Sequence, residues 1–182
     1  MLSFNHVEFS YSDQQVFTDL NFQLEHGEFA CLIGKSGAGK STLIQLVYMN
    51  ILPSSGYLQV GEFDSKTIKP GMLPLLRRKL GVVFQDFRLL SDRNIFENLS
   101  FVLEATNSPR KEVIRKVNNA LTDVGLSHRR RSMPKELSGG EKQRIALARA
   151  LMNEPKLILP MSRLAIWMKR MPYWLRRSFS SW

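Results

Sequence analysis

The sequence contains little that points to secretion, disulfide bonding or a membrane span. Its single cysteine, Cys31, excludes an internal disulfide, and its place in an apolar run predicts a small buried side chain. No window approaches the roughly 20 consecutive apolar residues that a transmembrane helix needs. The first ten residues alternate like a strand, without the basic segment and apolar core of a signal peptide. We therefore expect a cytoplasmic chain with one sizeable hydrophobic core.

Acidic residues are also few: 16 aspartates and glutamates stand against 26 lysines and arginines, for a net charge of +10. Such an excess favours nucleic acid or an anionic membrane as a partner. The excess is partly local, because residues 160–182 hold five basic residues and no acidic one, and residues 1–159 alone carry a charge of +5. We therefore expect no nucleic-acid partner. For the basic run from Arg129 to Arg131, a solvated face and a membrane-surface contact both stay open.

What the sequence does contain is a glycine-rich loop between an apolar, strand-like run at 29–33 and a helix-forming segment at 42–46. The loop fits the pattern G-x-x-x-x-G-K-[ST], whose backbone N–H groups surround a phosphate. Lys40 would supply a positive charge to the β- and γ-phosphates, and the Ser41 hydroxyl would bind Mg²⁺. The predicted nucleotide-binding residues of this loop are Gly34, Lys35, Ser36, Gly37, Ala38, Gly39, Lys40, Ser41 and Thr42.

A second candidate phosphate site lies much further along the chain, at residues 137–141. Ser138 is placed to cap a helix, the two glycines after it leave room for a phosphate, and the residues that follow are strongly helix-forming. Alone, this pattern would be an ordinary helix start; after a phosphate-binding loop it predicts a second phosphate contact. The residues concerned are Leu137, Ser138, Gly139, Gly140 and Glu141.

The two motifs, in this order, resemble those of the nucleotide-binding subunits of ABC transporters, and the resemblance runs from Met1 to Leu159. It implies an α/β fold of the P-loop NTPase class and ABC ATPase type, with a mixed β-sheet core and a helical subdomain, here incomplete at its C-terminal end. It also implies ATP and Mg²⁺ as cofactors. In the family, ATP lies between the loop of one subunit and the 137–141 motif of the other, in a head-to-tail homodimer.

Two further residues gain a role from this resemblance. Gln85 is similar to the family's glutamine that reaches Mg²⁺ and the attacking water, so Lys40 and Gln85 are the candidate catalytic residues, and Ser41 and Gln85 the candidate metal ligands. Tyr11 is similar to the aromatic residue that stacks on adenine. Taken without the resemblance, Gln85 is a polar residue that closes an apolar strand, and Tyr11 is a core or surface tyrosine.

The segment 76–98 narrows the resemblance to the FtsE-type cell-division ATP-binding proteins, because Gln85 to Arg93 follow the pattern QDxxLLxDR. Proteins of that type act as dimers on the inner face of the plasma membrane, together with the integral membrane protein FtsX, and control cell-wall hydrolases. An FtsX-like partner and a peripheral membrane location are therefore implied. The alternative is the ATP-binding subunit of a related exporter, of the lipoprotein-release or macrolide type.

The predicted layout has two parts and a tail. Residues 1–87 form the catalytic core, with strands predicted at 2–10, 20–25, 29–33, 57–60 and 80–84. Residues 88–152 form the helical subdomain with the second motif, with helices predicted from Asn94 to Thr106, from Pro109 to Gly125 and after Ser138. Residues 153–159 begin the strand that carries the Walker B acids in the family, and residues 160–182 form an aberrant tail.

The resemblance fails after the apolar run that ends at Leu159. The family continues there with an aspartate and a catalytic glutamate, in the pattern ADEPTGNLD, whereas this chain continues Pro160, Met161, Ser162. Residues 160–182 also hold all three tryptophans. Legal codons for Leu159 to Met168, read in a shifted frame, encode Ala-Asp-Glu-Pro-Thr-Gly-Asn-Leu-Asp. The hypothesis is that one nucleotide was lost at the Leu159 codon and that residues 160–182 are an out-of-frame tail.

The missing acids change the expected activity. Neither Met161 nor Ser162 can act as a general base, and losing such a base typically lowers a rate by about 10² to 10⁴. We expect a chain that binds nucleotide but hydrolyses none above background. Two other interpretations stay open: a naturally truncated, non-hydrolysing regulator whose basic tail docks on a membrane, and a P-loop kinase or GTPase. The 137–141 motif and the lack of an NKxD guanine motif count against the latter.

Overall fold

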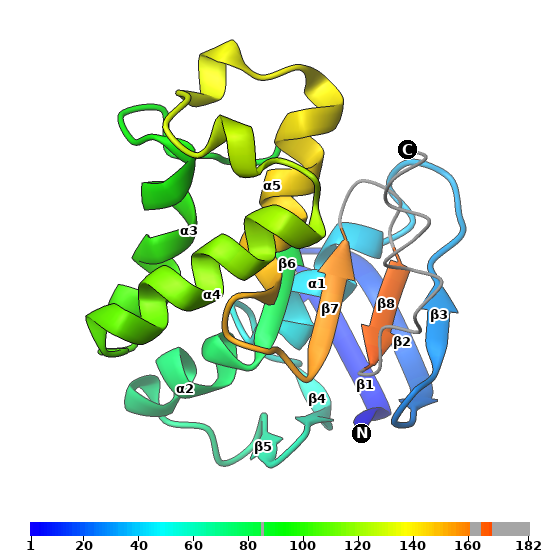
Figure 1. The fold of residues 1–182 in the computed structure, drawn as a ribbon. Coiled ribbons are helices and arrows are strands. Elements are labelled where there is room, and N and C mark those ends of the chain that lie inside the picture. Colours follow the sequence, from blue (N-terminus) through cyan, green and yellow to red (C-terminus); the bar gives the residue numbers. More distant parts are fainter. Residues whose placement is uncertain (85, 161–164, 169–182) are drawn as a thin grey trace. The chain divides into compact units, whose positions relative to one another are not determined.

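The structure is a computed structural model that describes residues 1–84, 86–160 and 165–168. The chain divides into two compact units, and Figure 1 shows their elements in the colours of the sequence. The first unit holds Met1–Leu80 together with the described residues from Lys156 onward, and the second holds Gly81–Pro155. The glycine loop and Tyr11 belong to the first unit, and the 137–141 motif belongs to the second.

An antiparallel four-stranded sheet is the larger sheet of the first unit, in the order β2-β1-β4-β5. Its strands are β1 (Leu2–Tyr11), β2 (Gln14–Leu24), β4 (Ser55–Val60) and β5 (Phe63–Asp64). Apolar side chains of β1 are buried, while most of β2 is exposed. Strand β2 begins at Gln14, before the predicted start at Leu20. The sequence analysis misses this part because polar and apolar residues come there in pairs, without the alternation that marks a half-buried strand.

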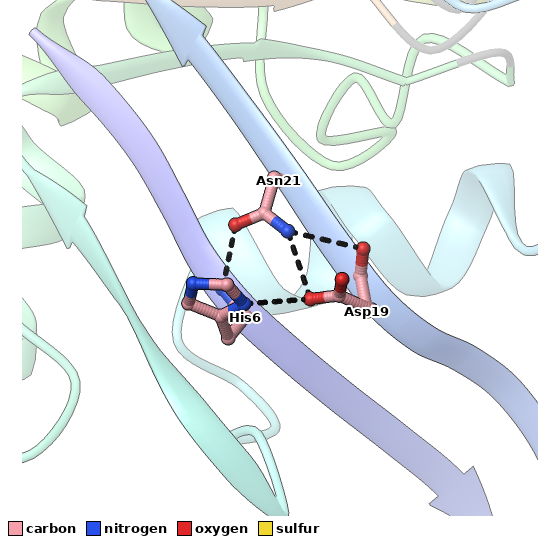
Figure 2. A network of polar contacts seen from close by, with 3 residues as sticks. All are labelled: His6, Asp19 and Asn21. Carbon is pink, nitrogen blue, oxygen red and sulfur yellow. Dashed lines mark hydrogen bonds and ion pairs between the residues drawn. The ribbon is translucent and has the colours of Figure 1, made fainter.

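A bulge interrupts β1 at His6, where the backbone is left-handed with φ 49° and the register shifts against both neighbours. Asn21 of β2 accepts a hydrogen bond from the His6 N–H at 2.9 Å, and the His6 ring lies 2.9 Å from Asp19 Oδ1 (Figure 2). On the other side, a Cβ at Gly56 would lie 2.1 Å from the His6 carbonyl oxygen. The bulge therefore needs a glycine in β4 and polar partners in β2.

The second sheet places β8 (Ala165–Met168) between β3 (Phe29–Cys31) and β7 (Leu157–Pro160), antiparallel to both. The sequence analysis predicts no helix or strand after residue 159, so the structure differs from the prediction by containing β8.

The prediction of a buried Cys31 is wrong, because the cysteine is exposed. Residues 29, 31 and 33 share one face of an extended chain, and Phe29 and Ile33 on that face are 54% and 90% exposed.

One helix of the first unit packs its apolar face into the core. It is α1 (Lys40–Val47), and its Leu43, Ile44, Leu46 and Val47 are buried. Beyond β5, the chain forms a short 3-10 turn, η1 (Pro70–Met72), and then α2 (Leu73–Arg78). The guanidinium of Arg77 lies 4.9 Å from the centre of the Tyr48 ring, which ties α2 to the segment after α1.

The second unit is mainly helical. It contains all but the first residue of β6 (Leu80–Val83), then α3 (Ile95–Glu104), α4 (Arg110–Asp123) and α5 (Gly139–Leu151), with 3-10 turns η2 (Ser127–Arg129) and η3 (Pro134–Glu136). Its core is a cluster of buried apolar side chains: Ile95, Leu99, Leu103, Val113, Val117, Leu121, Leu126, Leu137, Ile145, Ala148 and Met152. Among the described residues, no helix is long and apolar enough to cross a membrane.

Candidate nucleotide-binding site

The loop at 34–41 leads from β3 directly into α1 and contains two left-handed glycines, Gly37 with φ 84° and Gly39 with φ 81°. A Cβ at Gly39 would lie 2.7 Å from Val16 Cγ1 of β2, whereas a Cβ at Gly37 would meet nothing within 4 Å. Gly39 is therefore required both by backbone conformation and by the approach of β2. Ala38 N–H donates to the Lys35 carbonyl at 3.2 Å, which closes the loop into a tight turn.

The N-terminal end of α1 provides free donors beside this loop. The helix begins at Lys40, two residues before the predicted start, and its N-cap residue Gly39 has no side chain to cap it. The first N–H groups of a helix lack intrahelical partners and attract anions. The first turn of α1 contains no acidic residue that would repel a phosphate. The arrangement suits an anion at the start of the helix.

The Lys40 ammonium lies within the loop itself. Its Nζ donates to the carbonyl oxygens of Gly34, at 2.8 Å, and Lys35, at 2.6 Å. The charge is thus held at the loop by neutral carbonyl oxygens. A phosphate that entered the loop would compete for the same ammonium with a full negative charge. The side chains of Lys35 and Ser36 and that of Ser41 are exposed.

Tyr11 is the last residue of β1, and its side chain is 43% exposed. Its ring meets Phe9 edge to face, with centroids 4.8 Å apart and an interplanar angle of 84°. Phe9 therefore fixes the tyrosine ring from within the same strand. The exposed part of the ring is available for stacking.

The 137–141 motif forms the start of α5, where Ser138 is the N-cap and Glu141 completes a capping box. The Ser138 N–H and Oγ both donate to Glu141 Oε2 at 2.8 Å, and Glu141 N–H donates to Ser138 Oγ at 3.3 Å. The predicted helix start is confirmed. Leu137 is buried in the core of the second unit, and so anchors the motif, while Gly139 is exposed.

Glu141 is held on its other side by Arg129, whose Nε donates to Glu141 Oε1 at 3.1 Å. Hydrogen bonds from the backbone and side chain of Ser138, with a smaller contribution from Arg129, lower the pKa of Glu141 to about 2. The next arginine, Arg130, lies with its guanidinium 4.4 Å from the centre of the Phe96 ring. Two of the three residues in the basic run therefore have partners within the chain.

Gln85 lies outside the described residues, but the turn that follows it is described. Phe87 and Arg88 both have left-handed backbones, with φ 59° and 43°. Arg149 of α5 holds this turn: its Nη2 donates to the Phe87 carbonyl at 2.8 Å and its Nη1 to the Arg88 carbonyl at 2.7 Å. Burial lowers the pKa of Arg149. Sequence reasoning missed this residue, because an arginine near the end of an amphipathic helix gives no signal of what it binds.

Asn98 of α3 is a second residue that the sequence analysis missed. Its side chain is 0% exposed, and its carboxamide closes the loop that follows the Phe87–Arg88 turn. Nδ2 donates to the carbonyls of Leu90, Arg93 and Asn94, each at 3.0 Å, and Oδ1 accepts from the Leu90 N–H at 2.7 Å. This loop is the end of the QDxxLLxDR stretch, so a buried amide fixes the segment on which the narrower resemblance rests.

The family of the chain is shown by a comparison of its sequence with protein families. Residues 17–160 match the family described as "ABC transporter". The chain belongs to this family. Its predicted α/β fold of the ABC ATPase type is confirmed by the solved structures that it resembles.

Among curated proteins, the chain is similar to the cell division ATP-binding protein FtsE of Streptococcus pneumoniae, with 45% identity over 140 residues that cover 77% of this chain and 61% of that protein. FtsE of Mycobacterium tuberculosis is 40% identical over 161 residues, 87% of this chain and 70% of its own length. The methionine import protein MetN of Vibrio cholerae is 43% identical over 153 residues, 83% of this chain and 44% of its own length. The chain thus spans about three fifths of its streptococcal relative.

A solved structure with a similar fold is the dimeric, post-hydrolysis state of the ATP-binding cassette MJ0796 bound to ADP and Pi. It is 28% identical, with a TM-score of 0.76, and the match covers 88% of this chain and 73% of that cassette. A relative of this fold therefore holds nucleotide as a dimer.

Proposed function

We propose that the chain is the ATP-binding subunit of an FtsE–FtsX-like ABC complex that acts in cell division. The observation that carries this proposal is the loop at 34–41, where left-handed glycines, an uncapped helix start and the Lys40 ammonium converge on one place. The similarity to FtsE proteins of two genera supports the cell-division assignment. The partner would be an FtsX-like integral membrane protein, which would place the chain at the inner face of the plasma membrane.

In this proposal, the loop residues bind the β- and γ-phosphates through backbone N–H groups, and Lys40 adds its charge. The exposed Ser41 hydroxyl, together with Gln85, would hold Mg²⁺, which suits an ion that keeps several waters and takes few protein ligands. No cluster of three or more His, Cys, Asp or Glu side chains capable of holding a metal occurs among the described residues. Tyr11 would stack on adenine. The 137–141 motif of a second copy would contact the γ-phosphate in a head-to-tail dimer.

The chain is further proposed to bind ATP without hydrolysing it. The general base of the family is an acid after residue 159, and Met161 and Ser162 occupy those positions. Both lie outside the described residues. The frame hypothesis accounts for the substitution, since a single lost nucleotide at the Leu159 codon converts the acidic motif into Pro160 and the residues after it. Sequencing the gene tests the hypothesis, and a read without the acidic motif one frame away removes it.

Binding and hydrolysis are tested with the purified chain. Titration calorimetry should detect ATP binding, and Lys40→Ala should weaken it by roughly 10 to 100-fold, the equivalent of a lost charged hydrogen bond of about 1.5 to 3 kcal/mol. Lys69→Ala is the matched control, because Lys69 is an exposed lysine of the same unit. Phosphate release should stay at background for this chain and rise when the corrected frame is expressed. Equal ATP affinity in the Lys40 and Lys69 variants contradicts the assignment.

A second candidate is the ATP-binding subunit of a different ABC complex. The observation that favours this candidate is the similarity to MetN, whose sequence identity to the chain is close to that of the FtsE proteins. Pull-down from membranes with the corrected-frame protein separates the two: an FtsX-like protein is the expected partner, and a transport permease in its place supports the second candidate.

A further inference from the structure

The part of the first unit that contains η1 and α2 is positively charged. Residues 65–84 include five basic residues and no acidic one. The acidic residues that come just before them are Glu62 and Asp64. Glu62 is paired with Lys79 and lies 4.0 Å from the Lys156 ammonium, so two lysines offset its charge. Asp64 is half-buried and accepts a hydrogen bond from a backbone N–H at 2.7 Å.

Helix α2 turns one face to the core of the first unit and the opposite face to solvent. On the inner face, Leu76 is 0% exposed, and the Arg77 guanidinium lies over the Tyr48 ring. Leu75 and Arg78 stand three residues apart and therefore share the outer face. Leu75 is 49% exposed, and Arg78 is exposed as well. A large apolar side chain and a cation thus lie side by side on the solvent face.

Met72, the last residue of η1, adds to the exposed apolar area, since its side chain is 37% exposed. Its N–H donates to the Lys69 carbonyl at 2.8 Å, which closes the turn. Prolines 70 and 74 stand at the starts of η1 and α2 and restrict the backbone on both sides. The exposed residues of this region, which we call the α2 surface, are Lys66, Lys69, Met72, Leu75 and Arg78.

The chemistry of the α2 surface matches an anionic lipid bilayer. Anionic headgroups attract the cations, and the apolar layer beneath them accepts exposed apolar side chains without any matching shape. A stable protein interface, in contrast, buries roughly 800 Å² on each partner in closely fitted contact. Two apolar side chains beside a helix of six residues offer little of such a surface.

We propose that the α2 surface docks the first unit on an anionic lipid surface, with Met72 and Leu75 entering the headgroup region. The charges are complementary, because each basic residue close to such a membrane strengthens binding by about five-fold. The three cations of the α2 surface together supply a factor of about 100. The inference goes beyond the proposed function, since neither the glycine loop nor the 137–141 motif belongs to this surface.

The first test is co-sedimentation with vesicles of phosphatidylcholine, alone or mixed with phosphatidylglycerol in equal parts. The unsubstituted chain should bind the mixed vesicles only, and added salt should weaken the binding. The double variant Lys66→Gln, Lys69→Gln should bind about 25-fold more weakly. Its control is Lys111→Gln, Arg115→Gln, which makes the same change of charge at exposed positions of α4 and should bind like the unsubstituted chain.

A second test reports insertion rather than attraction. An environment-sensitive fluorophore is attached at Leu75→Cys, or at Ile114→Cys as the control, in a chain that carries Cys31→Ser because Cys31 is exposed. Ile114 is an exposed apolar residue of α4, at 39%. Mixed vesicles should shift the emission to shorter wavelength at position 75 and leave position 114 unchanged. Polyglutamate, an anion without an apolar layer, should shift neither.

Each outcome decides the inference. Residues 160–182 are basic as well, so equal vesicle affinity in the Lys66, Lys69 variant and in its α4 control would assign the binding to another part of the chain and overturn the proposal. An unsubstituted chain that stays in solution with mixed vesicles overturns it too. A label at position 75 that responds to polyglutamate as it does to vesicles identifies an acidic protein as the partner instead of lipid.

Discussion

Replacing Asn98 by aspartate should destabilise the second unit strongly, although the two side chains have nearly the same shape. The carboxamide nitrogen is surrounded by three carbonyl oxygens at 3.0 Å, and the side chain is 0% exposed. In the variant an oxygen faces these carbonyls. Asn94 O keeps a partner, because it also accepts the Asn98 backbone N–H at 2.9 Å. The Leu90 carbonyl also keeps a partner, the Arg93 N–H at 3.4 Å. Of the three carbonyls, that of Arg93 would therefore lose the donor that Asn98 supplies.

The magnitude follows from this one carbonyl group. A buried polar group left without its partner costs about 1 to 3 kcal/mol, a substantial part of the roughly 5 to 15 kcal/mol that is typical of a domain. Burial beside carbonyl oxygens should also raise the pKa of the new carboxyl group. A protonated carboxyl regains one donor, so the defect should be smaller in mild acid than at neutral pH.

The assay is native-state hydrogen exchange of the buried α3 amides, at Leu99 and Leu103, at pH 5 and pH 7. Asn119→Asp is the control, because it makes the same chemical change at an exposed position of α4. An Asn98 variant whose exchange free energies match those of the Asn119 variant would refute the reasoning. So would a defect of equal size at both pH values, which would show that the new carboxyl does not titrate in a buried site.

Three further outcomes are expected. Gly39→Ala should destabilise the first unit by about 1 to 3 kcal/mol in urea unfolding, from overpacking and a left-handed backbone, and Gly37→Ala should cost less, since its added Cβ meets nothing within 4 Å. The stability that the capping box gives to α5 should not change between pH 7 and pH 5. The pKa of Glu141 is lowered from 4.5 to about 2. The stabilising contribution of the Glu141 carboxylate is therefore present above pH 4.5 and is lost as the pH falls toward 2. The chemical shift of the Ser138 amide in a pH titration should report that midpoint, and a midpoint near 4.5 would contradict it. Arg129→Met should raise this midpoint only modestly, because the hydrogen bonds from Ser138 lower the pKa more.

Sequence patterns predicted the helices well, because the residues that cap a helix are close to its first turn in the sequence. Asn94 with Glu97 and Ser138 with Glu141 each form a capping box, a pattern that is visible in the sequence before any fold is known. Pro109 marks the start of α4 in the same way. The phosphate-binding loop could be predicted from the sequence equally well, because the left-handed backbone at Gly37 and Gly39 requires glycine at these positions.

Features that depend on distant contacts could not be predicted in this way. Cys31 sits in an apolar run that suggests burial, yet whether a strand is covered depends on elements elsewhere in the chain, and the face of β3 that holds Cys31 is exposed. Strand β8 lies in the segment that the sequence analysis treats as an aberrant tail, so no strand is predicted there although residues 164–168 form an apolar run. Arg149 binds carbonyls that lie 61 and 62 residues before it in the sequence, and no spacing rule connects them.

The two candidate phosphate sites differ in what a phosphate must displace. At the loop, the Lys40 ammonium is held by neutral carbonyls of Gly34 and Lys35. At the start of α5, the Ser138 hydroxyl donates to a carboxylate, whose negative charge also opposes an incoming phosphate. The hydrogen bonds at both sites are charge-assisted, but of the two sites only the second holds a carboxylate that opposes the phosphate, so the second site is the harder one to open. Nucleotide should therefore bind first at the loop, and the 137–141 motif should engage only when a γ-phosphate, already fixed by Lys40, is brought against Ser138. In the proposed dimer, triphosphate should be favoured over diphosphate at the step that joins two copies, and not at the step that loads the first.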